Sequence, residues 1–564
     1  MDKIIECIPN FSEGRDAGVI KEITDVIESA GNIKLLDVSP GKATNRTVVT
    51  FVGPPDAVVE AAFRGIQKAS ERIDMRRHTG EHPRFGATDV CPLVPIANTT
   101  MNETVEYARE LAKRTGEELG IPVYCYEFAA FKEKRKSLAH CRTGEYESLK
   151  KRIALEEWIP DFGPSKWSER VARTGAAAIG ARNFLVAYNI NLNTTSVRDA
   201  RIIASLVRES GRPMRRGDPF TGKIVTDENG FPVRIPGTLK KTRAIGWYIK
   251  EYNKAQISMN LTDISVTPVH IAFEEVSKIA REQGARVTGS EVIGLIPLQS
   301  MLDAGKYFLH KNRRSSGIPD AEIIQFAIKS LGLSELHPFC PDKKIIDYLV
   351  QKQNHETITA RTIASFIQNT PSETQTPGEG SIAALLGALG AALGTLTANR
   401  ATSAAENEEW QKYAYWAEEC KQAQNRFKEH IDRQNEAFRQ VKSALTPSLP
   451  GENEKTSRQK ELQKAVRQSI EISLIVMEEI NHTLQIIREI AEAGIYHSSA
   501  NAGMGTLCAL TASEGTYLNI KTNAVRCLDK TYVSDSLNKA ANYLLSAKEK
   551  EKSIMEIVER NLGD

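Results

Sequence analysis

The chain has 564 residues, 41% of them apolar and 26% charged, a balance typical of a soluble globular protein with about two to four domains. Its 74 basic and 71 acidic residues leave a net charge of +3, which excludes the basic footprint of a general nucleic-acid binder. The eight cysteines are scattered without a Cys-x-x-Cys pair, and the N-terminus lacks the apolar core of a signal peptide. The apolar run from Ile382 to Ala398 is shorter than the ~20 residues of a membrane span. These three features predict a cytoplasmic protein.

The first third of the chain alternates between strand and helix patterns. Short β-branched or apolar runs predict strands at 3–9, 33–38, 47–52 and 89–95, and helical spacing predicts helices at 17–29 and from Gly53 to about Ile73. This β-α-β-β-α-β order is the split βαβ arrangement of a ferredoxin-like layer. A further helix at about 103–119 and a strand at 122–126 extend it.

Residues 183–330 repeat the theme. Strands are predicted at 183–192, 243–252, 255–261 and 287–296, helices at 196–210 and 268–283, and an insertion loop rich in Gly, Pro and charge at 211–241. Because the same order occurs twice, we expect two similar α/β lobes with a cleft between them, the usual place for a ligand.

After about residue 340 the strand patterns vanish and helical periodicity dominates, at 408–444, 456–493 and 535–561. The run at 382–398 follows a linker-like break at 371–377, and its small residues allow close helix contacts: Ala384, Gly387, Ala388, Ala391 and Gly394. The predicted fold class is therefore an α/β N-terminal half with two ferredoxin-like lobes, followed by an all-α domain of the kind that pairs into dimers.

The stretch RHTGEHPRFG (77–86) concentrates charge and contains His-x-x-Glu-His, a zinc-peptidase pattern. A metal site needs both His78 and His82 on one helical face, but Gly80 and Pro83 oppose a helix there. We expect a loop whose histidine and glutamate, flanked by arginines, suit acid/base chemistry on an anionic substrate. A zinc site and a solvated basic turn remain alternatives.

Longer motifs carry a family resemblance. CIPNFSEG (7–14), TNRTVVTFVGPP (44–55), RHTGEHPR (77–84), GATDVCP (86–92), PDFGPS (160–165), GARNFLVAYNINL (180–192) and GWY (246–248) resemble glutamate formimidoyltransferase. The whole chain resembles the bifunctional formimidoyltransferase-cyclodeaminase family, which implies transferase lobes at 1–181 and 182–332, a linker with a first helical segment at 333–376, and a cyclodeaminase-like domain at 377–564.

The resemblance implies transfer of the formimino group from N-formimino-L-glutamate to N5 of tetrahydrofolate, with tetrahydrofolate as co-substrate and no metal. It makes His82 the catalytic acid/base, with Glu81 and His78 as supporting candidates. An imidazole titrating near neutrality can take the proton from N5 and deliver one to the departing glutamate nitrogen. The implied partners are these small molecules and further copies of the chain, with neither nucleic acid nor membrane.

The binding residues are also implied by the resemblance. The folate segment is expected at Gly163, Pro164, Ser165, Lys166, Trp167 and Gly175, with Trp167 able to stack on an aromatic ring. Candidate carboxylate clamps are Arg46, Arg84 and Arg182, with Glu81 as a further substrate-binding candidate.

The second domain departs from its family. Where an active-site aspartate is expected in a helical Asp-x-Asp-x-x-Ala-Phe pattern, the chain reads DRQNEAF (432–438), which places Gln434 at that position. The expected Pro-Gly-Gly-Gly-Ser is PGEGS (377–381), and Ser-Asp-Ala-Gly is ANAG (500–503). Because a carboxamide cannot exchange protons near pH 7, we hypothesise weak or absent cyclodeaminase activity, unless Asp432 or Glu436 substitutes.

Two other classes of function are kept beside the transferase: a zinc-dependent hydrolase using His78 and His82, and a non-catalytic folate-binding scaffold. The sequence leaves open the preference for polyglutamates, the passage of product between domains, the size of the oligomer and the use of formylglutamate as a donor.

Overall fold

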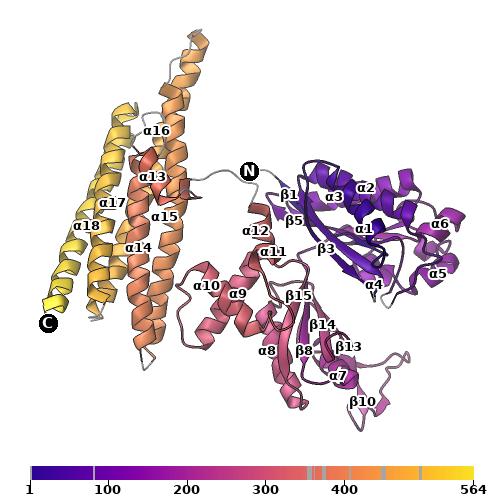
Figure 1. Ribbon diagram of the computed structural model, residues 1–564. Coiled ribbons are helices and arrows are strands. Elements are labelled where there is room, and N and C mark those ends of the chain that lie inside the picture. The colour runs from indigo at the N-terminus through magenta and orange to yellow at the C-terminus, as the bar shows by residue number, and fades with distance from the viewer. Residues whose placement is uncertain are drawn as a thin grey trace. The chain divides into compact units, whose positions relative to one another are not determined.

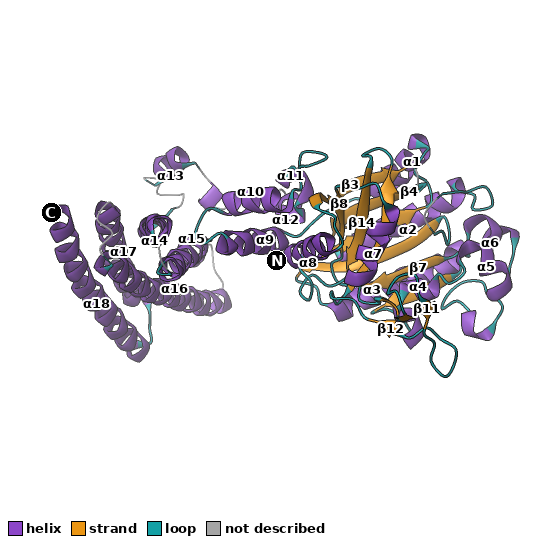
Figure 2. Cartoon of the chain, turned by 90° about the horizontal axis from the view of Figure 1, so that it is seen from below, coloured by secondary structure: helices purple, strands orange, loops and turns teal. Residues whose placement is uncertain are grey.

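The computed structural model describes residues 3–563 except 43, 81–82, 352–357, 361, 371–376, 406–407, 446–451 and 494–497. The chain divides into two compact units: Met1–Ala304 with Ile328–Lys352, and Gly305–Ala327 with Gln353–Asp564. The strands of the described residues all belong to the first unit (Figures 1 and 2). The predicted domain boundaries at 181, 332 and 376 stay predictions.

The first lobe has the predicted ferredoxin-like order. Its elements are β1 (Ile4–Cys7), α1 (Ala17–Glu28), β3 (Lys34–Gly41), β4 (Arg46–Gly53), α2 (Pro55–Arg72) and β5 (Thr88–Ala97). The strands lie antiparallel in the order β5-β1-β4-β3, and β2 (Asn10–Phe11) continues β1 between β4 and β5. Beyond β5 the sheet gains two parallel strands, β7 (Ala177–Ala181) and β6 (Val123–Glu127), with α3 (Met101–Leu119) as the crossover between β5 and β6.

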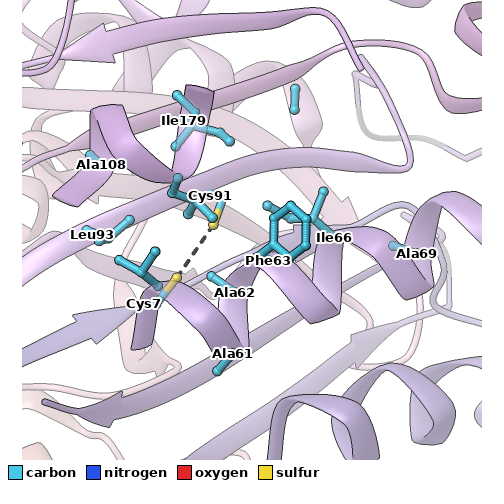
Figure 3. Packing of buried hydrophobic residues seen from close by; sticks show 14 of the residues in the cluster. Cys7, Ala61, Ala62, Phe63, Ile66, Ala69, Cys91, Leu93, Ala108 and Ile179 are labelled. Atoms are coloured by element: carbon cyan, nitrogen blue, oxygen red, sulfur yellow. Dashed lines mark hydrogen bonds between the residues drawn. The ribbon is translucent and has the colours of Figure 1, made fainter. Parts of the chain in front are cut away.

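The hydrophobic core of this lobe lies on one face of the sheet, under α1, α2 and α3. Successive residues of a strand point to opposite faces, so Ile5 and Cys7 of β1 enter the core while Glu6 faces the other way. In the core, the Cys7 and Cys91 sulfurs lie 3.5 Å apart, near Phe63 of α2 (Figure 3). On the opposite face, Tyr124 and Tyr126 of β6 pack in a second apolar cluster with Cys141 and Leu149 from short helices of the same lobe. The part of that face formed by β1, β2 and β4 lines a cleft instead.

The second lobe repeats this topology. Its elements are β8 (Val186–Leu192), α7 (Val197–Val207), β13 (Thr242–Ile249), β14 (Lys254–Leu261), α8 (Val269–Glu282) and β15 (Val287–Ile293). The strand order β13-β14-β8-β15, all antiparallel, matches that of the first lobe strand for strand. Gly246 is required here, because a Cβ would lie 2.2 Å from the Ala200 carbonyl carbon where α7 crosses β13.

The predicted insertion loop carries two short ladders, β9 (Arg212–Pro213) with β12 (Arg234–Ile235), and β10 (Arg215–Arg216) with β11 (Lys223–Ile224). Two-residue strands leave no periodicity to recognise. The short helices of the first lobe were likewise not predicted: η1 (Glu133–Lys136), α4 (Leu138–Cys141), α5 (Glu145–Arg152), η2 (Glu156–Trp158) and α6 (Glu169–Thr174). Nor were α9 (Leu298–Lys311) and α10 (Asp320–Leu331). The range 333–376, where a first helical segment was expected, contains α11 (Pro341–Lys344), α12 (Ile346–Gln351), η3 (Ile358–Ala360) and α13 (Ile363–Asn369).

The second unit is an antiparallel bundle of long helices, as predicted (Figure 1). These are α14 (Glu379–Ala404), α15 (Trp410–Leu445), α16 (Glu452–Glu492), α17 (Ser499–Arg526) and α18 (Lys530–Gly563). The small face of α14 packs closely: a Cβ on Gly387 would lie 2.9 Å from the Phe427 ring, and one on Gly390 2.8 Å from the Gly505 carbonyl oxygen. The predicted close helix contact is confirmed.

Helix α14 alone, among the described residues, is long and apolar enough to cross a membrane. It packs against both α15 and α17, and most of its apolar stretch is buried inside the bundle. Helix α14 therefore belongs to the core of the bundle. All eight cysteines are free thiols, in agreement with the prediction, and six of them are buried.

Candidate active sites

A cleft of about 930 Å³ lies in the first unit, lined by both lobes as predicted. The first lobe contributes the open face of its sheet, where alternate residues of β1, β2 and β4 line the cleft: Glu6, Ile8, Asn10, Arg46, Val48 and Thr50. The second lobe contributes Ala187, Asn260, Glu291 and Ile293 from the face of its sheet that α7 and α8 leave open. The cleft thus lies between the open faces of the two sheets, which present both polar and apolar side chains.

Charged residues of both signs line the cleft. The basic ones are Arg46, Lys136, Arg182, Lys241, Arg243 and Lys344, and the acidic ones are Glu6, Glu127, Glu209, Asp263 and Glu291. Burial raises the pKa of both Glu127 and Glu291. Burial also raises the pKa of Glu6, to about 8, although the nearby positive charge of Arg182 opposes that shift. The cleft is therefore suited to a ligand with both acidic groups and N–H donors.

A buried carboxylate connects the cleft to the histidine-rich loop. Asp89, 0% exposed, accepts a hydrogen bond from Arg46 and forms an ion pair with Arg142, whose Nη2 lies 3.0 Å from Asp89 Oδ2. Arg46 also donates to Asn10 Oδ1 from Nε (3.0 Å) and Nη2 (2.9 Å), which fixes its guanidinium on the cleft floor. Arg142 donates to the backbone oxygen of Pro83 (2.6 Å). One carboxylate therefore holds a cleft arginine and the arginine that anchors the loop.

Asp89→Asn is expected to destabilise the first lobe by about 3 kcal/mol or more, because two arginines lose the buried charge that compensates them. Hydrogen exchange measured by mass spectrometry should become faster in peptides around residues 44–50 and 84–92. Asp74→Asn removes a carboxylate from the exposed pair with Arg76 and is expected to cost less than about 1 kcal/mol. Equal protection in the two variants would contradict the role given to Asp89.

Part of the loop packs beside the cleft. The buried His78 donates from Nε2 to the backbone oxygen of Asn45 (2.8 Å), and Asn45 donates to the backbone oxygen of Thr79 (2.9 Å). A Cβ on Gly80 would lie 2.2 Å from the Thr44 backbone oxygen, and Thr44 lines the cleft. Described residues on both sides of Glu81 and His82 are non-helical, as predicted, while these two residues lie outside the described part of the chain.

The structure separates the predicted binding residues. Arg46 and Arg182 line the cleft, but Arg84 does not; its guanidinium contacts Glu147 (3.1 Å from Nε), the Met75 oxygen (2.9 Å) and the Tyr146 ring. Arg84 therefore holds the loop to neighbouring segments, and its role as a carboxylate clamp stays a prediction. None of the predicted folate residues Gly163, Pro164, Ser165, Lys166, Trp167 and Gly175 is among those lining the cleft.

Backbone packing explains the glycines of that segment. A Cβ on Gly116 of α3 would lie 2.6 Å from the Gly163 nitrogen, and one on Gly175 would lie 2.4 Å from the Phe85 oxygen. Both Gly163 and Gly175 have positive φ, at 84° and 67°. The Trp167 ring lies 6.1 Å from the Tyr146 ring, against the small apolar cluster that includes Phe85.

A second pocket, of about 290 Å³, lies within the helical unit. It is lined by Gly378, Glu379, Gly380, Ser381, Gln434, Phe438, Val441, Lys442, Leu445, Ser469, Asn519, Thr522, Asn523 and Arg526. Gln434, 3% exposed, donates from Nε2 to Ser473 Oγ (3.0 Å), and Ser473 donates to Asn519 Oδ1 (3.2 Å). The predicted position thus lies in a pocket of amides and hydroxyls.

The two carboxylates suggested as substitutes do not line this pocket. Asp432 accepts hydrogen bonds from the Ile358 and Thr359 backbone N–H groups (3.0 and 3.4 Å) and from the Thr359 hydroxyl (2.7 Å). Glu436 is exposed and accepts from Gln440 (3.0 Å). Helical residues two apart point in different directions, so both flank Gln434 without replacing it. Glu379 is the sole acidic residue among the described residues that line the pocket.

Twin α/β lobes around a cleft lined by charged residues, followed by a helical bundle with a pocket of its own, are typical of an enzyme with two small-molecule sites. The family model described as formiminotransferase domain, N-terminal subdomain, matches residues 4–182, and formiminotransferase domain matches 187–351. The model described as formiminotransferase-cyclodeaminase matches 362–542. The chain belongs to the formimidoyltransferase-cyclodeaminase family.

Full-length relatives agree. The chain is 38% identical to formimidoyltransferase-cyclodeaminase of Dictyostelium discoideum and 35% identical to that of Gallus gallus, covering 99% of both chains in each comparison. It is 43% identical to glutamate formimidoyltransferase of Thermoplasma acidophilum over 56% of this chain and 95% of that one. A solved formiminotetrahydrofolate cyclodeaminase of Thermotoga maritima covers 36% of this chain and 98% of its own, at 17% identity and a TM-score of 0.32, too low to carry an argument.

These relatives give no support to the zinc hydrolase or to the non-catalytic scaffold. The described contacts of His78 add a physical reason, because its Nε2 already donates to a backbone oxygen. The sequence interpretation did not single out Glu6, Asp89 or Arg142. Glu6 is a lone acid inside an apolar strand, a signal that could have been noticed, whereas only the fold brings Arg142 to Asp89.

Proposed function

We propose that the cleft between the lobes is the site of formimino transfer and that His82 is its acid/base. The chain is a glutamate formimidoyltransferase with tetrahydrofolate as co-substrate and an additional cyclodeaminase domain. The observation that carries the placement is the anchoring of the loop around His82. Thr79 and Gly80 pack on the cleft side at Thr44–Asn45, and Pro83 is held through Arg142 to Asp89.

The chemistry assigns a task to each group. N5 of tetrahydrofolate attacks the formimino carbon, a tetrahedral centre forms, and the bond from that carbon to the glutamate nitrogen breaks. The imidazole of His82 takes the proton from N5 and gives one to the departing nitrogen, so the proton count is balanced. Arg182 and Arg46 supply positive charge for substrate carboxylates, and Arg46 is held in place by Asn10 and Asp89. The folate segment 163–167 with Gly175, and Glu81, remain part of the proposal.

The test is a coupled assay on the purified chain with N-formimino-L-glutamate and tetrahydrofolate, in which formimino transfer and ammonia release are followed separately. Transfer that requires both substrates is the expected result. A protein that binds tetrahydrofolate but transfers nothing would overturn the proposed function.

For the second pocket we propose that deamination is slow compared with transfer. Gln434 supports this proposal, because it occupies the position of an expected carboxylate and is hydrogen-bonded as an amide within an amide and hydroxyl network. The domain then serves to bind folate and to hold copies of the chain together.

We further propose that the protein is cytoplasmic and forms a homo-oligomer through the helical unit. Met504, Leu507, Leu518 and Val525 of α17 are exposed at helical spacing, so that they form one apolar row on the bundle surface. Leu389 and Leu396, seven residues apart on the neighbouring α14, are exposed as well. Exposed apolar side chains that gather on neighbouring helices in this way mark association surfaces.

Replacing both Leu518 and Val525 by Glu is expected to shift the protein to a smaller oligomer, because charges would be buried at the contact. Sedimentation velocity of the full chain measures the change. Phe231→Glu, which replaces an equally exposed apolar residue of the first unit, should leave the oligomer unchanged. An unaltered sedimentation profile in the α17 double variant would rule out this surface.

A further inference from the structure

Glu6 is an unusual residue for the middle of a sheet. It lies on β1, between β4 and β5, where its neighbours in register are Val52 and Val94. The two residues that flank it in sequence, Ile5 and Cys7, belong to the hydrophobic core. Strand alternation turns Glu6 to the other face, so that it lines the cleft while remaining only 1% exposed.

The carboxyl group of Glu6 is incompletely satisfied. Its Oε2 is buried and has no hydrogen-bond partner. An unpaired buried polar atom costs about 1–3 kcal/mol, so native proteins rarely keep one without a use for it. An apolar cluster containing Ile4, Val52, Phe184, Leu295 and Ile346 lies beside this end of the sheet. A ligand in the cleft is the natural source of the missing donor.

The charges around Glu6 narrow the chemistry. Arg182 is the cationic group that acts on Glu6, yet Glu6 Oε2 accepts no hydrogen bond from Arg182 or from any other residue that the structure describes. The side chain therefore acts as an acceptor for N–H groups, and in the ionised state its two oxygens can take two parallel N–H···O bonds. A planar edge with two adjacent N–H donors fits this arrangement.

We propose that Glu6 binds the planar N–C–N donor edge of a substrate in the cleft through its two carboxylate oxygens. This inference rests on the proposed transfer function. Both substrates present such an edge: the pterin ring of tetrahydrofolate through its amide N–H and 2-amino group, and formiminoglutamate through its formimino group. In either case Glu6 binds and positions the substrate through its N–H donors, whereas the neighbouring arginines bind its carboxylates.

Binding of N–H donors to Glu6 should be accompanied by a measurable release of protons. Burial holds the pKa of free Glu6 at about 8, so the carboxyl is mostly protonated at pH 7. Donated N–H bonds favour the ionised form and lower that pKa in the complex, so binding at pH 7 should release close to one proton. At pH 9 the free carboxyl is already ionised, and the release should vanish.

The experiment uses the full chain and tetrahydrofolate under anaerobic conditions. Calorimetric titrations in two buffers of different ionisation enthalpy count the released protons for the unaltered protein and for Glu6→Gln, which keeps the shape of the side chain. The variant should lose the proton release and bind about 10- to 100-fold more weakly. Glu106→Gln, which removes an exposed carboxylate of the first lobe outside the cleft, should change affinity less than about twofold.

The KM for formiminoglutamate shows which of the two substrates presents the N–C–N donor edge to Glu6. Weaker tetrahydrofolate binding with an unchanged donor KM identifies the pterin ring, and the reverse identifies the formimino group. If affinity, donor KM and proton release are all unchanged in Glu6→Gln, the inference is overturned, while transfer by the unaltered protein keeps the proposed function intact. The proton count on the unaltered protein needs no variant, so a misfolded Glu6→Gln would not leave the question open.

Discussion

His82→Ala is expected to lower the rate of formimino transfer by about 10²–10⁴ while leaving tetrahydrofolate affinity within about twofold. The reaction moves a proton off N5 and onto a poor leaving group, and a methyl group can do neither. Folate affinity should survive, because many of the described residues that line the cleft lie on the strands of two sheets and do not depend on the imidazole. Steady-state transfer and equilibrium binding, measured on the same preparation, separate the two effects.

A matched control exists four residues upstream. His78 is buried with its Nε2 on the Asn45 oxygen, and burial lowers its pKa, so it is suited to hold the loop in its neutral form. His78→Gln retains a donor and should cost far less activity than His82→Ala. If the two variants lose transfer equally, or if His82→Ala abolishes folate binding, the loop has only a structural role and the acid/base assignment fails.

Local sequence patterns predicted much of the fold. Alternating apolar residues and helical spacing predicted both ferredoxin-like lobes. They did so because each strand or helix has one buried face, whose residues are apolar at the period of that element. Helix α17 was not predicted, since small residues such as Gly503, Gly505 and Ala509 pack closely without an apolar periodicity. The two-residue strands of the insertion are held by turns and arginine contacts that leave no repeating pattern.

The candidate site was only partly predictable, for a different reason. Arg46 and Arg84 both belong to recognised motifs, yet the fold turns Arg46 into the cleft and binds Arg84 to Glu147. Side-chain direction depends on the sheet face and on partners brought from distant segments, as the Asp89–Arg142 pair shows. A motif therefore identifies which residues matter, whereas the tertiary contacts decide whether each one binds a ligand or holds the site in place.

Gln434→Asp is expected to raise ammonia release from 5-formiminotetrahydrofolate by about 10²–10⁴, because it installs a proton-transfer group in a pocket already shaped for the ligand. Gln434 already fills the space beside Gly380, because a Cβ on Gly380 would lie 2.7 Å from Gln434 Oε1. The side chain of Asp is shorter than that of Gln and therefore fits at this position. Ser473 must turn its hydroxyl from Asn519 toward the new carboxylate, which can only accept. Lys442 and Arg526, which also line the pocket, would help to keep the carboxylate ionised.

Two further variants make the comparison specific. Gln440→Asp adds the same group at an exposed position of α15 and should leave ammonia release unchanged. Glu379→Gln removes the acid that already lines the pocket. If the unaltered protein releases ammonia as fast as it transfers the formimino group, the slow-deamination proposal is wrong, and loss of that release in Glu379→Gln would show that the catalytic carboxylate has moved from the α15 position to the start of α14.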